Sequence, residues 1–332
     1  MKIARLLLFL LSVITLTACS SSDDEPTRNY RKNYYTVTLS LGGEYVTVTE
    51  EPMSKAQTNA KKYVGINIYC KPAGNPNSDY SHYAYGVFDN TDKMSISLPG
   101  EYIYKFECTS AKEADDTFPN SVLSQPFTVN NYYSALNLNQ FVVSSSQYLC
   151  DIKSGRTLVA LDSENMELRT YPRMDRFYGE LDNYDPSEIQ SVTIPLKRTV
   201  FGIKITVEGV PDGSLTWKQK GAQSTNQSLI FSHGSASGNS QQEYSHIYTF
   251  KSVYDCWNNA NHSENFIIQF TWTRSNNFQQ TFEKEITVKR NVMSVLNVSL
   301  KGTDIAAGIG IDEETSDMVT EEIPVEFDGQ GN

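Results

Sequence analysis

Hydrophobic and polar residues alternate along most of this chain, and clusters of Gly, Asn, Asp, Pro and Ser interrupt the alternation. Such a period of two is typical of antiparallel strands with one buried face. The clearest case is residues 201–207, where Phe201, Ile203 and Ile205 lie on one side and polar residues on the other. Segments of helical period are almost absent. The pattern therefore predicts an all-β protein, and two β-sandwiches fit it better than a barrel or an α/β enzyme.

The alternation also predicts individual strands. Val37, Leu39 and Leu41 lead to Gly42 and Gly43, and Val46 and Val48 then resume the pattern, which predicts a hairpin with its turn at the two glycines. The stretch 154–172 could contain two short strands. Further strands are expected at 63–70, 84–88, 94–98, 102–108, 127–129, 201–207, 266–272, 282–288 and 292–300.

The best candidate for a linker is "LDNYDPSE" at 181–188, which is acidic, rich in turn formers and contains Pro186. Placing the boundary there gives a first β-sandwich at 34–187 and a second at 188–302. Residues 303–332 then form a C-terminal tail. Either sandwich has an ordinary domain length.

The N-terminus has the features of an export signal. Lys2 and Arg5 supply positive charge, and the apolar run from Leu6 to Ala18 is too short to span a bilayer. We therefore expect residues 1–18 to be a signal peptide that is removed.

The end of this signal, Leu16-Thr17-Ala18-Cys19, resembles the lipobox of bacterial lipoproteins. That resemblance implies that Cys19 is acylated, for example with palmitate, and becomes the mature N-terminus. Two or three acyl chains anchor a protein stably, whereas a single chain does so only marginally. An ordinary secretory signal that happens to contain a Cys is the weaker alternative. Residues 19–33 would then be a flexible tether, and its acidic stretch 20–25 resembles a signal for export to the outer face of the outer membrane.

Charge and cysteine content exclude several classes of protein. The formal net charge is −11, and no basic cluster is present to neutralise phosphates, so nucleic acid is not an expected partner. The cysteines beyond Cys19 show no CxxC arrangement and no His at ligand spacing, which argues against zinc. Cys70 and Cys108 continue the apolar faces of their predicted strands and are expected to be reduced and buried.

The sequence shows no catalytic constellation, so we expect no enzyme activity and no cofactor or metal. The four histidines are scattered, no nucleophile elbow or phosphate-binding loop is present, and each His is expected at the surface or in a loop. Tyr and Trp, including Trp217, Trp257 and Trp272, could instead form a glycan-stacking surface. Tyr is also a good strand former, and burial of these rings is the favoured interpretation.

Several motifs resemble the fimbrillin superfamily, and more narrowly its fimbrial-anchor branch, the lipoproteins at the base of type V pili. They cover nearly the whole mature chain and are "YAYGVFDN" (83–90), "GEYIYKFECT" (100–109), "RTYPRMDRFYGELDN" (169–183), "VTIPLKRTVFGIKITVEGVPDG" (192–213) and "KRNVMSVLNVSL" (289–300).

This resemblance implies two transthyretin-like β-sandwiches in tandem, no catalysis, and assembly with other fimbrial subunits by strand donation. In the family, stalk subunits lose an N-terminal strand by cleavage after an Arg and receive a neighbour's strand in its place. A lipid-held anchor must keep its N-terminus, and Arg28 and Arg31 precede the first strand pattern here. The resemblance thus implies a lipid-anchored, surface-exposed outer-membrane subunit that anchors or caps a fimbria and serves adhesion.

The tail is the expected site of the contact with other subunits. Ile323, Val325 and Phe327 alternate with Pro324 and Glu326, which is the pattern of a strand that could be donated. Pro324 removes one backbone donor from such a strand. Two alternatives remain open at this point: the tail is disordered, or it folds back onto its own second domain.

Overall fold

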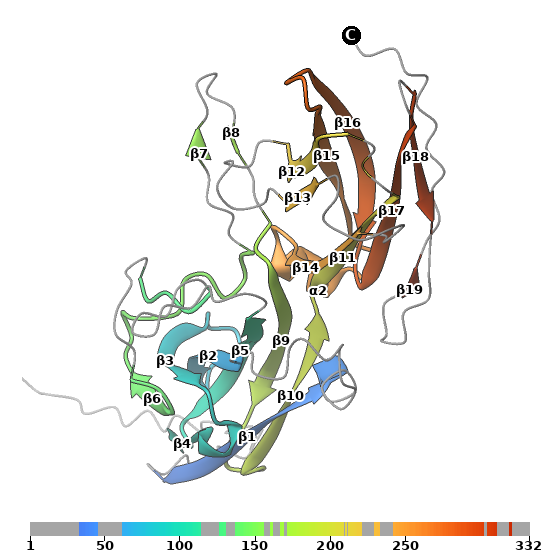
Figure 1. Cartoon of the computed structure of the whole chain (residues 1–332). Coiled ribbons are helices and arrows are strands. Elements are labelled where there is room, and N and C mark those ends of the chain that lie inside the picture. Colours follow the sequence, from blue (N-terminus) through green and yellow to red (C-terminus); the bar gives the residue numbers. More distant parts are fainter. Residues whose placement is uncertain are drawn as a thin grey trace, which may run out of the picture.

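A computed structural model of the chain describes two β-rich units joined end to end (Figure 1). Most of the described residues lie in strands, so the all-β prediction is confirmed. The described residues are 33–45, 62–113, 126–130, 137–155, 160–161, 167–168, 171–208, 210, 212–220, 229–232, 242–301, 304–310 and 319–320.

The first unit is built on one eight-stranded sheet with the order β4-β1-β10-β9-β5-β2-β3-β6. Residues from both halves of this sheet share one buried cluster, so the sheet folds over its own core. Val37 of β1 and Ile194 of β10 face Ile66 of β2 and Phe106 of β5 across it. The strands are β1 (Tyr34–Gly43), β2 (Lys62–Pro72), β3 (Ser81–Phe88), β4 (Ser95–Pro99), β5 (Tyr102–Glu113), β6 (Gln140–Val143), β9 (Met174–Tyr184) and β10 (Ser191–Arg198).

The strands differ in how their two faces are covered. Strand β10 alternates strictly between exposed and buried residues, because only one of its faces meets the core. Strand β2 is buried without a break from Tyr63 to Ile68, because a second cluster with Phe127, Leu149 and Ile152 covers its other face. The side chain of Asn67 on β2 fixes this cover: it donates to Leu149 O at 3.0 Å and accepts from Leu149 N at 2.9 Å. We call residues 126–130 and 137–155 the strap.

The second unit consists of two sheets that pack face to face. One has the order β14-β11-β17-β18 with β19 also beside β17, and the other has the order β13-β12-β15-β16. The strands are β11 (Val200–Glu208), β12 (Ser214–Gln219), β13 (Leu229–Ser232), β14 (Gln242–Thr249), β15 (Ser263–Thr273), β16 (Gln279–Lys289), β17 (Val292–Lys301), β18 (Asp304–Gly310) and β19 (Val319–Thr320).

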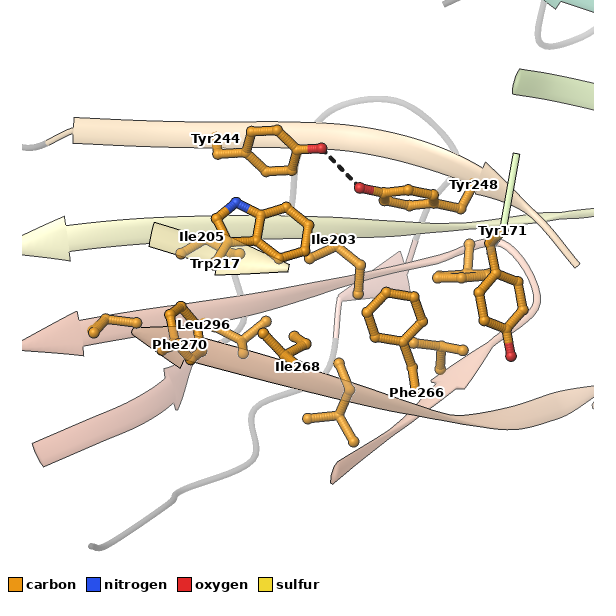
Figure 2. Packing of buried hydrophobic residues seen from close by; sticks show 14 of the residues in the cluster. Tyr171, Ile203, Ile205, Trp217, Tyr244, Tyr248, Phe266, Ile268, Phe270 and Leu296 are labelled. Atoms are coloured by element: carbon orange, nitrogen blue, oxygen red, sulfur yellow. Dashed lines mark hydrogen bonds between the residues drawn. The ribbon is translucent and has the colours of Figure 1, made fainter. Parts of the chain in front are cut away.

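Aromatic and branched side chains from both sheets fill the core of the second unit (Figure 2). Phe201, Ile203 and Ile205 of β11 are fully buried there, as the alternation predicts. Trp217 of β12 lies edge-on to Tyr244 of β14, with ring centroids 4.8 Å apart. Large rings fill such a layer with few rotatable bonds, which makes the packing specific.

Short elements complete the described chain. They are the 3₁₀ turn η1 (Thr91–Lys93), the helix α2 (Val253–Asn258) and the two-stranded ribbon of β7 (Ala160–Leu161) and β8 (Glu167–Leu168). The ribbon supplies the two short strands expected at 154–172. The expected strands at 63–70, 84–88, 94–98 and 102–108 correspond to β2, β3, β4 and β5. At 127–129 the structure has only an isolated bridge between Val129 and Leu149.

The two turns predicted from the sequence have different outcomes. Gly42 and Gly43 are the last two residues of β1, paired with Pro195 and Leu196 of β10, and Gly43 has a φ of +70°, so β1 ends at the glycines as predicted. The second arm of the predicted hairpin lies outside the described residues. The predicted linker at 181–188 belongs to the end of β9 and the loop to β10, and both strands are in the first sheet. The chain changes unit at Thr199, between β10 and β11.

Candidate functional site: the junction between the two units

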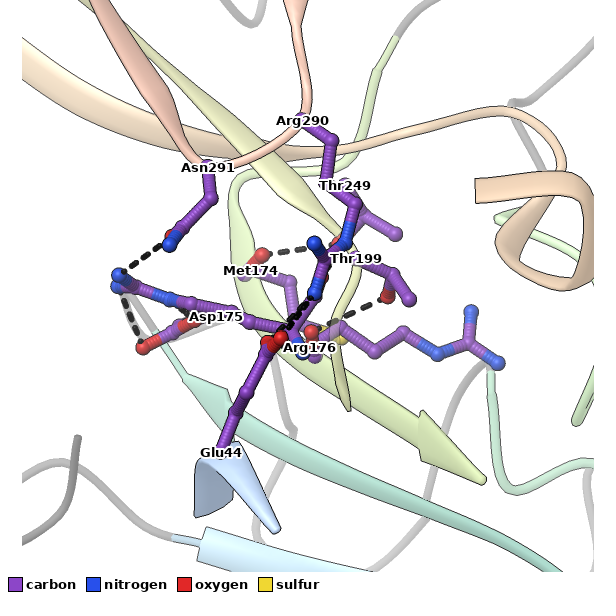
Figure 3. Close-up of polar contacts among 9 residues, drawn as sticks. Glu44, Met174, Asp175, Arg176, Thr199, Thr249, Arg290 and Asn291 are labelled. Carbon is purple, nitrogen blue, oxygen red and sulfur yellow. Dashed lines mark hydrogen bonds and ion pairs between the residues drawn. The ribbon is translucent and has the colours of Figure 1, made fainter. Parts of the chain in front are cut away.

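Two charged residues from opposite ends of the sequence meet at the junction (Figure 3). Glu44 follows directly after β1, and Arg290 lies in the turn between β16 and β17. Arg290 Nη2 donates to both carboxylate oxygens of Glu44, at 2.6 and 2.5 Å. Arg198 N also donates to Glu44 Oε2 at 2.8 Å, and Arg290 Nε donates to Arg198 O at 2.9 Å. The end of β1 is thereby bonded to both units.

Arg198 is the last residue of β10 and is 0 % exposed. Its Nε and Nη2 donate to the two carboxylate oxygens of Asp175 at 2.8 and 3.1 Å, a fork-shaped pairing that fixes the planes of both groups. Its Nη1 donates to Asn291 Oδ1 of the second unit at 3.4 Å. A buried ion pair gives little net stability but is costly to break. This pair lies within the first unit, where it holds the Arg198 guanidinium in place for its hydrogen bond to Asn291 of the second unit.

Arg176 attaches the strap to the first sheet. Its Nη1 donates to Ser154 O at 2.6 Å, and its Nη2 donates to Asp151 O at 2.9 Å and to Ile152 O at 2.7 Å. Burial in the protein lowers the pKa of this guanidinium to about 9. The turn that it holds then reaches the second unit, where Gly155 N donates to Lys251 O at 2.8 Å. Only Gly fits there, because a Cβ would lie 1.7 Å from Phe250 O.

Four charged side chains form a compact cluster on the outer face of the first sheet, beside the junction. Lys105 Nζ lies 2.7 Å from Glu180 Oε2, and Lys153 Nζ lies 2.6 Å from Glu107 Oε1. Burial would raise the pKa of Glu180, but hydrogen bonds from Lys105 and Tyr178 outweigh it and lower that pKa. A general acid at neutral pH needs a raised carboxyl pKa, so Glu180 is unsuited to that role. The cluster instead holds Lys153 of the strap against the sheet.

The histidines and cysteines that the structure describes are not brought together. Among the described residues, no group of three or more His, Cys, Asp or Glu side chains could hold a metal ion. His82 and His246 lie on β3 and β14 rather than in loops, because each packs against a neighbouring Tyr ring, Tyr69 and Tyr244. Cys70 and Cys108 are buried, as predicted, and Cys70, Cys108, Cys150 and Cys256 form no disulfide.

The three Trp residues, all of them described by the structure, do not share one exposed surface, as a glycan-stacking platform would require. Trp217 and Trp272 are only 1 and 2 % exposed, within the core of the second unit. Trp257 of α2 lies edge-on to Tyr178 of β9, with centroids 5.5 Å apart, and so belongs to the junction. The packing of the two sheets in the second unit buries the rings of Trp217 and Trp272, which a glycan-stacking surface would have to expose.

The sequence-predicted site residues lie outside the described part of the chain: Cys19, Ile323, Val325 and Phe327. The structure does describe two earlier pieces of the tail. Strand β18 pairs antiparallel with β17, and β19 pairs parallel with Val292 and Met293 at the start of β17. These pieces fold back onto the second unit, which was one of the two alternatives for the tail. No helix of the described chain is long and apolar enough to cross a membrane.

The junction residues were missed by the sequence analysis. Glu44 and Arg290 are 246 positions apart, and no local pattern links them. The one available signal is that Glu44 ends the alternation of β1 directly after two glycines.

No protein-family model matches the chain, and no curated protein is similar to it in sequence. Three similar solved structures are the fimbrial anchor protein Mfa2 from Porphyromonas gingivalis (10% identity, 83% of this chain and 96% of that one, TM-score 0.32), a fimbrial assembly protein from Parabacteroides distasonis (10%, 88% and 98%, 0.34), and a putative cell adhesion protein from Bacteroides uniformis (7%, 84% and 98%, 0.32). Each TM-score is low, so this similarity alone fixes neither the function nor the partners of the chain.

Proposed function

We propose that this protein is a lipid-anchored cell-surface subunit of the fimbrillin superfamily that anchors or caps a fimbria and serves adhesion, without enzymatic activity. Its two units would be the tandem transthyretin-like sandwiches that the sequence motifs imply. The lipobox residues Leu16 to Cys19 and the motifs at 83–109 and 169–213 support this assignment.

The position of β1 is the observation that carries the proposal. Strand β1 lies inside the first sheet, bonded to β4 on one side and to β10 on the other. Arg28 and Arg31 both precede Tyr34, so cleavage after either would leave β1 complete and its place in the sheet filled. A subunit that receives a neighbour's strand must vacate such a place. This chain keeps its own N-terminal strand. That is what we expect of a subunit that lies at the end of a fimbria and is held in the membrane by lipid on Cys19.

The contact with other subunits is proposed to come from the end of the tail. Strands β18 and β19 pair with β17, so the part of the tail that we propose to be donated as a strand is residues 321–332, beyond β19. Their apolar side chains Ile323, Val325 and Phe327 would fill alternate pockets of a neighbouring subunit, while backbone groups supply the hydrogen bonds.

Purification of surface fimbriae from the bacterium that encodes this chain tests the proposal directly. The wild-type chain should co-purify with the fimbriae. A chain lacking residues 321–332 should remain folded and on the surface but no longer co-purify. The matched control replaces Glu322 and Glu326 by Gln, which changes the polar face of the same segment and should preserve co-purification. Fimbriae that retain the truncated chain would refute strand donation by the tail.

The membrane anchor has its own test. Cys19→Ser should move the protein from the membrane fraction to the soluble fraction, because the apolar run before it is lost in maturation. The variant should keep the thermal stability of the wild type, since position 19 precedes the first strand. A Cys19→Ser protein that stays with the membrane after a high-salt wash would exclude the lipoprotein assignment.

A further inference from the structure

Two parallel strand pairs follow one another through the length of the molecule. Strand β1 is parallel to β10 over Thr38–Gly43 and Ser191–Leu196. Strand β11 is parallel to β17 over Gly202–Glu208 and Met293–Ser299. Only Thr199 separates β10 from β11, and Figure 1 shows β11 continuing from β10 into the second unit. We call β1, β10, β11 and β17 the spine.

The strand directions determine how the spine responds to tension. Because both pairs are parallel and β11 continues β10, the first residue of β1 and the last residue of β17 lie at opposite ends of the spine. Tension applied between Tyr34 and Lys301 therefore pulls β1 one way along β10 and pulls β17 the other way along β11. Each pair slides lengthwise, and the evenly spaced hydrogen bonds of a parallel ladder are loaded together.

We propose that the spine is a mechanical clamp, which gives this protein a tension-bearing function between its N-terminal tether and its C-terminal tail. Strands that slide lengthwise must lose all their hydrogen bonds in one step, whereas strands peeled from one end lose them one at a time. Forced unfolding is governed by the rate of that limiting step.

Glu44 provides a second route for the load. It lies at the end of β1 and bonds to Arg290, which precedes Val292, the first residue of β17. Tension on β1 thus reaches β17 through this ion pair as well as through β10 and β11. The side chain of Arg290 is 9 % exposed and that of Glu44 is 38 % exposed, so the pair is shielded from water on the Arg290 side only.

Strand β18 has the opposite geometry. It is antiparallel to β17, and Gly310 at its C-terminal end pairs with Val295 near the start of β17. When the tail beyond Gly310 is pulled away from the first unit, the force acts on the C-terminal end of β18. The hydrogen bonds between β18 and β17 then break one after another, starting at Gly310. We expect β18 to detach at low force, after which the load reaches Lys301 and the clamp.

Single-molecule pulling tests the clamp on residues 20–332, the mature chain without its lipidated Cys19, and needs neither lipid nor fimbriae. The proposed function enters only in one respect: it says that in the cell the tension acts between the N-terminal tether and the C-terminal tail. In the first geometry, handle domains of known unfolding force are fused to both ends. In the second, the C-terminal handle is moved into the exposed loop after Asn77, between β2 and β3. That loop lies at the same end of the first unit as Tyr34, so the load peels β1 instead of sliding it.

The clamp predicts a main unfolding force several-fold higher in the first geometry than in the second. Glu44→Gln should lower the force in the first geometry and leave the second unchanged, and Arg290→Lys should act in the same direction. Glu285→Gln, at an exposed position on β16, is the matched control and should change neither force. Each variant is first compared with the wild type by thermal denaturation, so that only folded proteins are pulled.

Equal forces in the two geometries would overturn the clamp. An unchanged unfolding force in Glu44→Gln would show that Glu44 carries none of the load in the clamp. Loss of fimbrial co-purification would leave these forces untouched, so a failed clamp and a failed fimbrial assignment are distinguishable.

Discussion

At the scale of single residues, the apolar faces were predictable from the sequence because the alternation is strict. The face of Phe201, Ile203 and Ile205 is fully buried, as expected. Glu107 and Arg198 could not be placed in this way, because a charged residue in a strand pattern is assigned to solvent unless its partner is known. Both are buried; Glu107 pairs with Lys153 of the strap, and Arg198 pairs with Asp175 of β9.

Replacing Ile203 tests the core of the second unit. Ile203→Ala should destabilise the protein by about 2–5 kcal/mol, because the removed side chain leaves a cavity in a packed core. Ile203→Asp should prevent folding of the second unit, since a carboxylate would be buried without a partner. The measurement is urea denaturation followed by circular dichroism. Native stability of Ile203→Asp would show that this side chain does not lie in the core.

Glu180 predicts a loss of stability in acid. The pKa of Glu180 is lowered on folding, so the folded state binds its proton less readily than the unfolded chain. Stability from this group is therefore present above the unfolded pKa, near 4.3, and is lost as the pH falls through the folded pKa. The difference in unfolding free energy between wild type and Glu180→Gln should shrink as the pH falls below about 4.5. A difference that does not vary with pH would contradict the ion pairing.

The buried cysteines should resist thiol reagents. Burial raises the pKa of the Cys108 thiol, so little thiolate is present at neutral pH, and the side chain is 0 % exposed. In the folded protein Cys108 should react with a thiol reagent only at the rate of unfolding. Mass mapping after a timed pulse of reagent measures this. Rapid labelling, or a disulfide at Cys108, would contradict the structure.

At the scale of elements, the hydrophobic pattern located most strands but not their neighbours. It placed a turn at Gly42 and Gly43, and β1 does end at Gly43, whose φ is +70°. It could not show that this end of β1 pairs with β10. Sequence signals are short in range, and the parallel pairing of β1 with β10 spans more than 150 residues.

Gly179 gives a sharp test of the β9–β10 pairing. A Cβ at this position would lie 2.1 Å from Pro195 O on β10, which is backbone and cannot move aside. Gly179→Ala should therefore destabilise the first unit by about 1–3 kcal/mol, as overpacking does in other cores. Gly74→Ala is the control, because nothing lies within 4 Å of its Cβ. Equal melting temperatures for the two variants would show that β9 and β10 do not approach this closely.

At the scale of the whole molecule, the sequence predicted two tandem units but placed the change of unit in the acidic loop. The turn-forming residues correctly indicated a loop, which the structure has at 185–190. Composition could not show that the strands on either side of it, β9 and β10, belong to one sheet. The real crossing at Thr199 has no loop composition at all. It is a buried Thr between two strands, so composition gave no signal there.

This difference predicts the outcome of cutting the chain. A specific protease site inserted after Ser187 should be cleavable in the loop, yet the two fragments should stay together in gel filtration without denaturant. They are held by the first sheet and by the junction residues Glu44 and Arg290. Fragments that separate freely after cleavage would support a flexible linker at 181–188 instead.

The positions of the three Trp residues also make the units spectroscopically distinct. Trp217 and Trp272 are in the core of the second unit, and Trp257 lies at the junction, so the first unit has tyrosines but no Trp of its own. Indole emission therefore reports the melting of the second unit and of the junction without any label. Replacing Trp257 by Phe would restrict that emission to the second unit, and the order in which the two units unfold could then be read from intrinsic fluorescence beside far-ultraviolet circular dichroism.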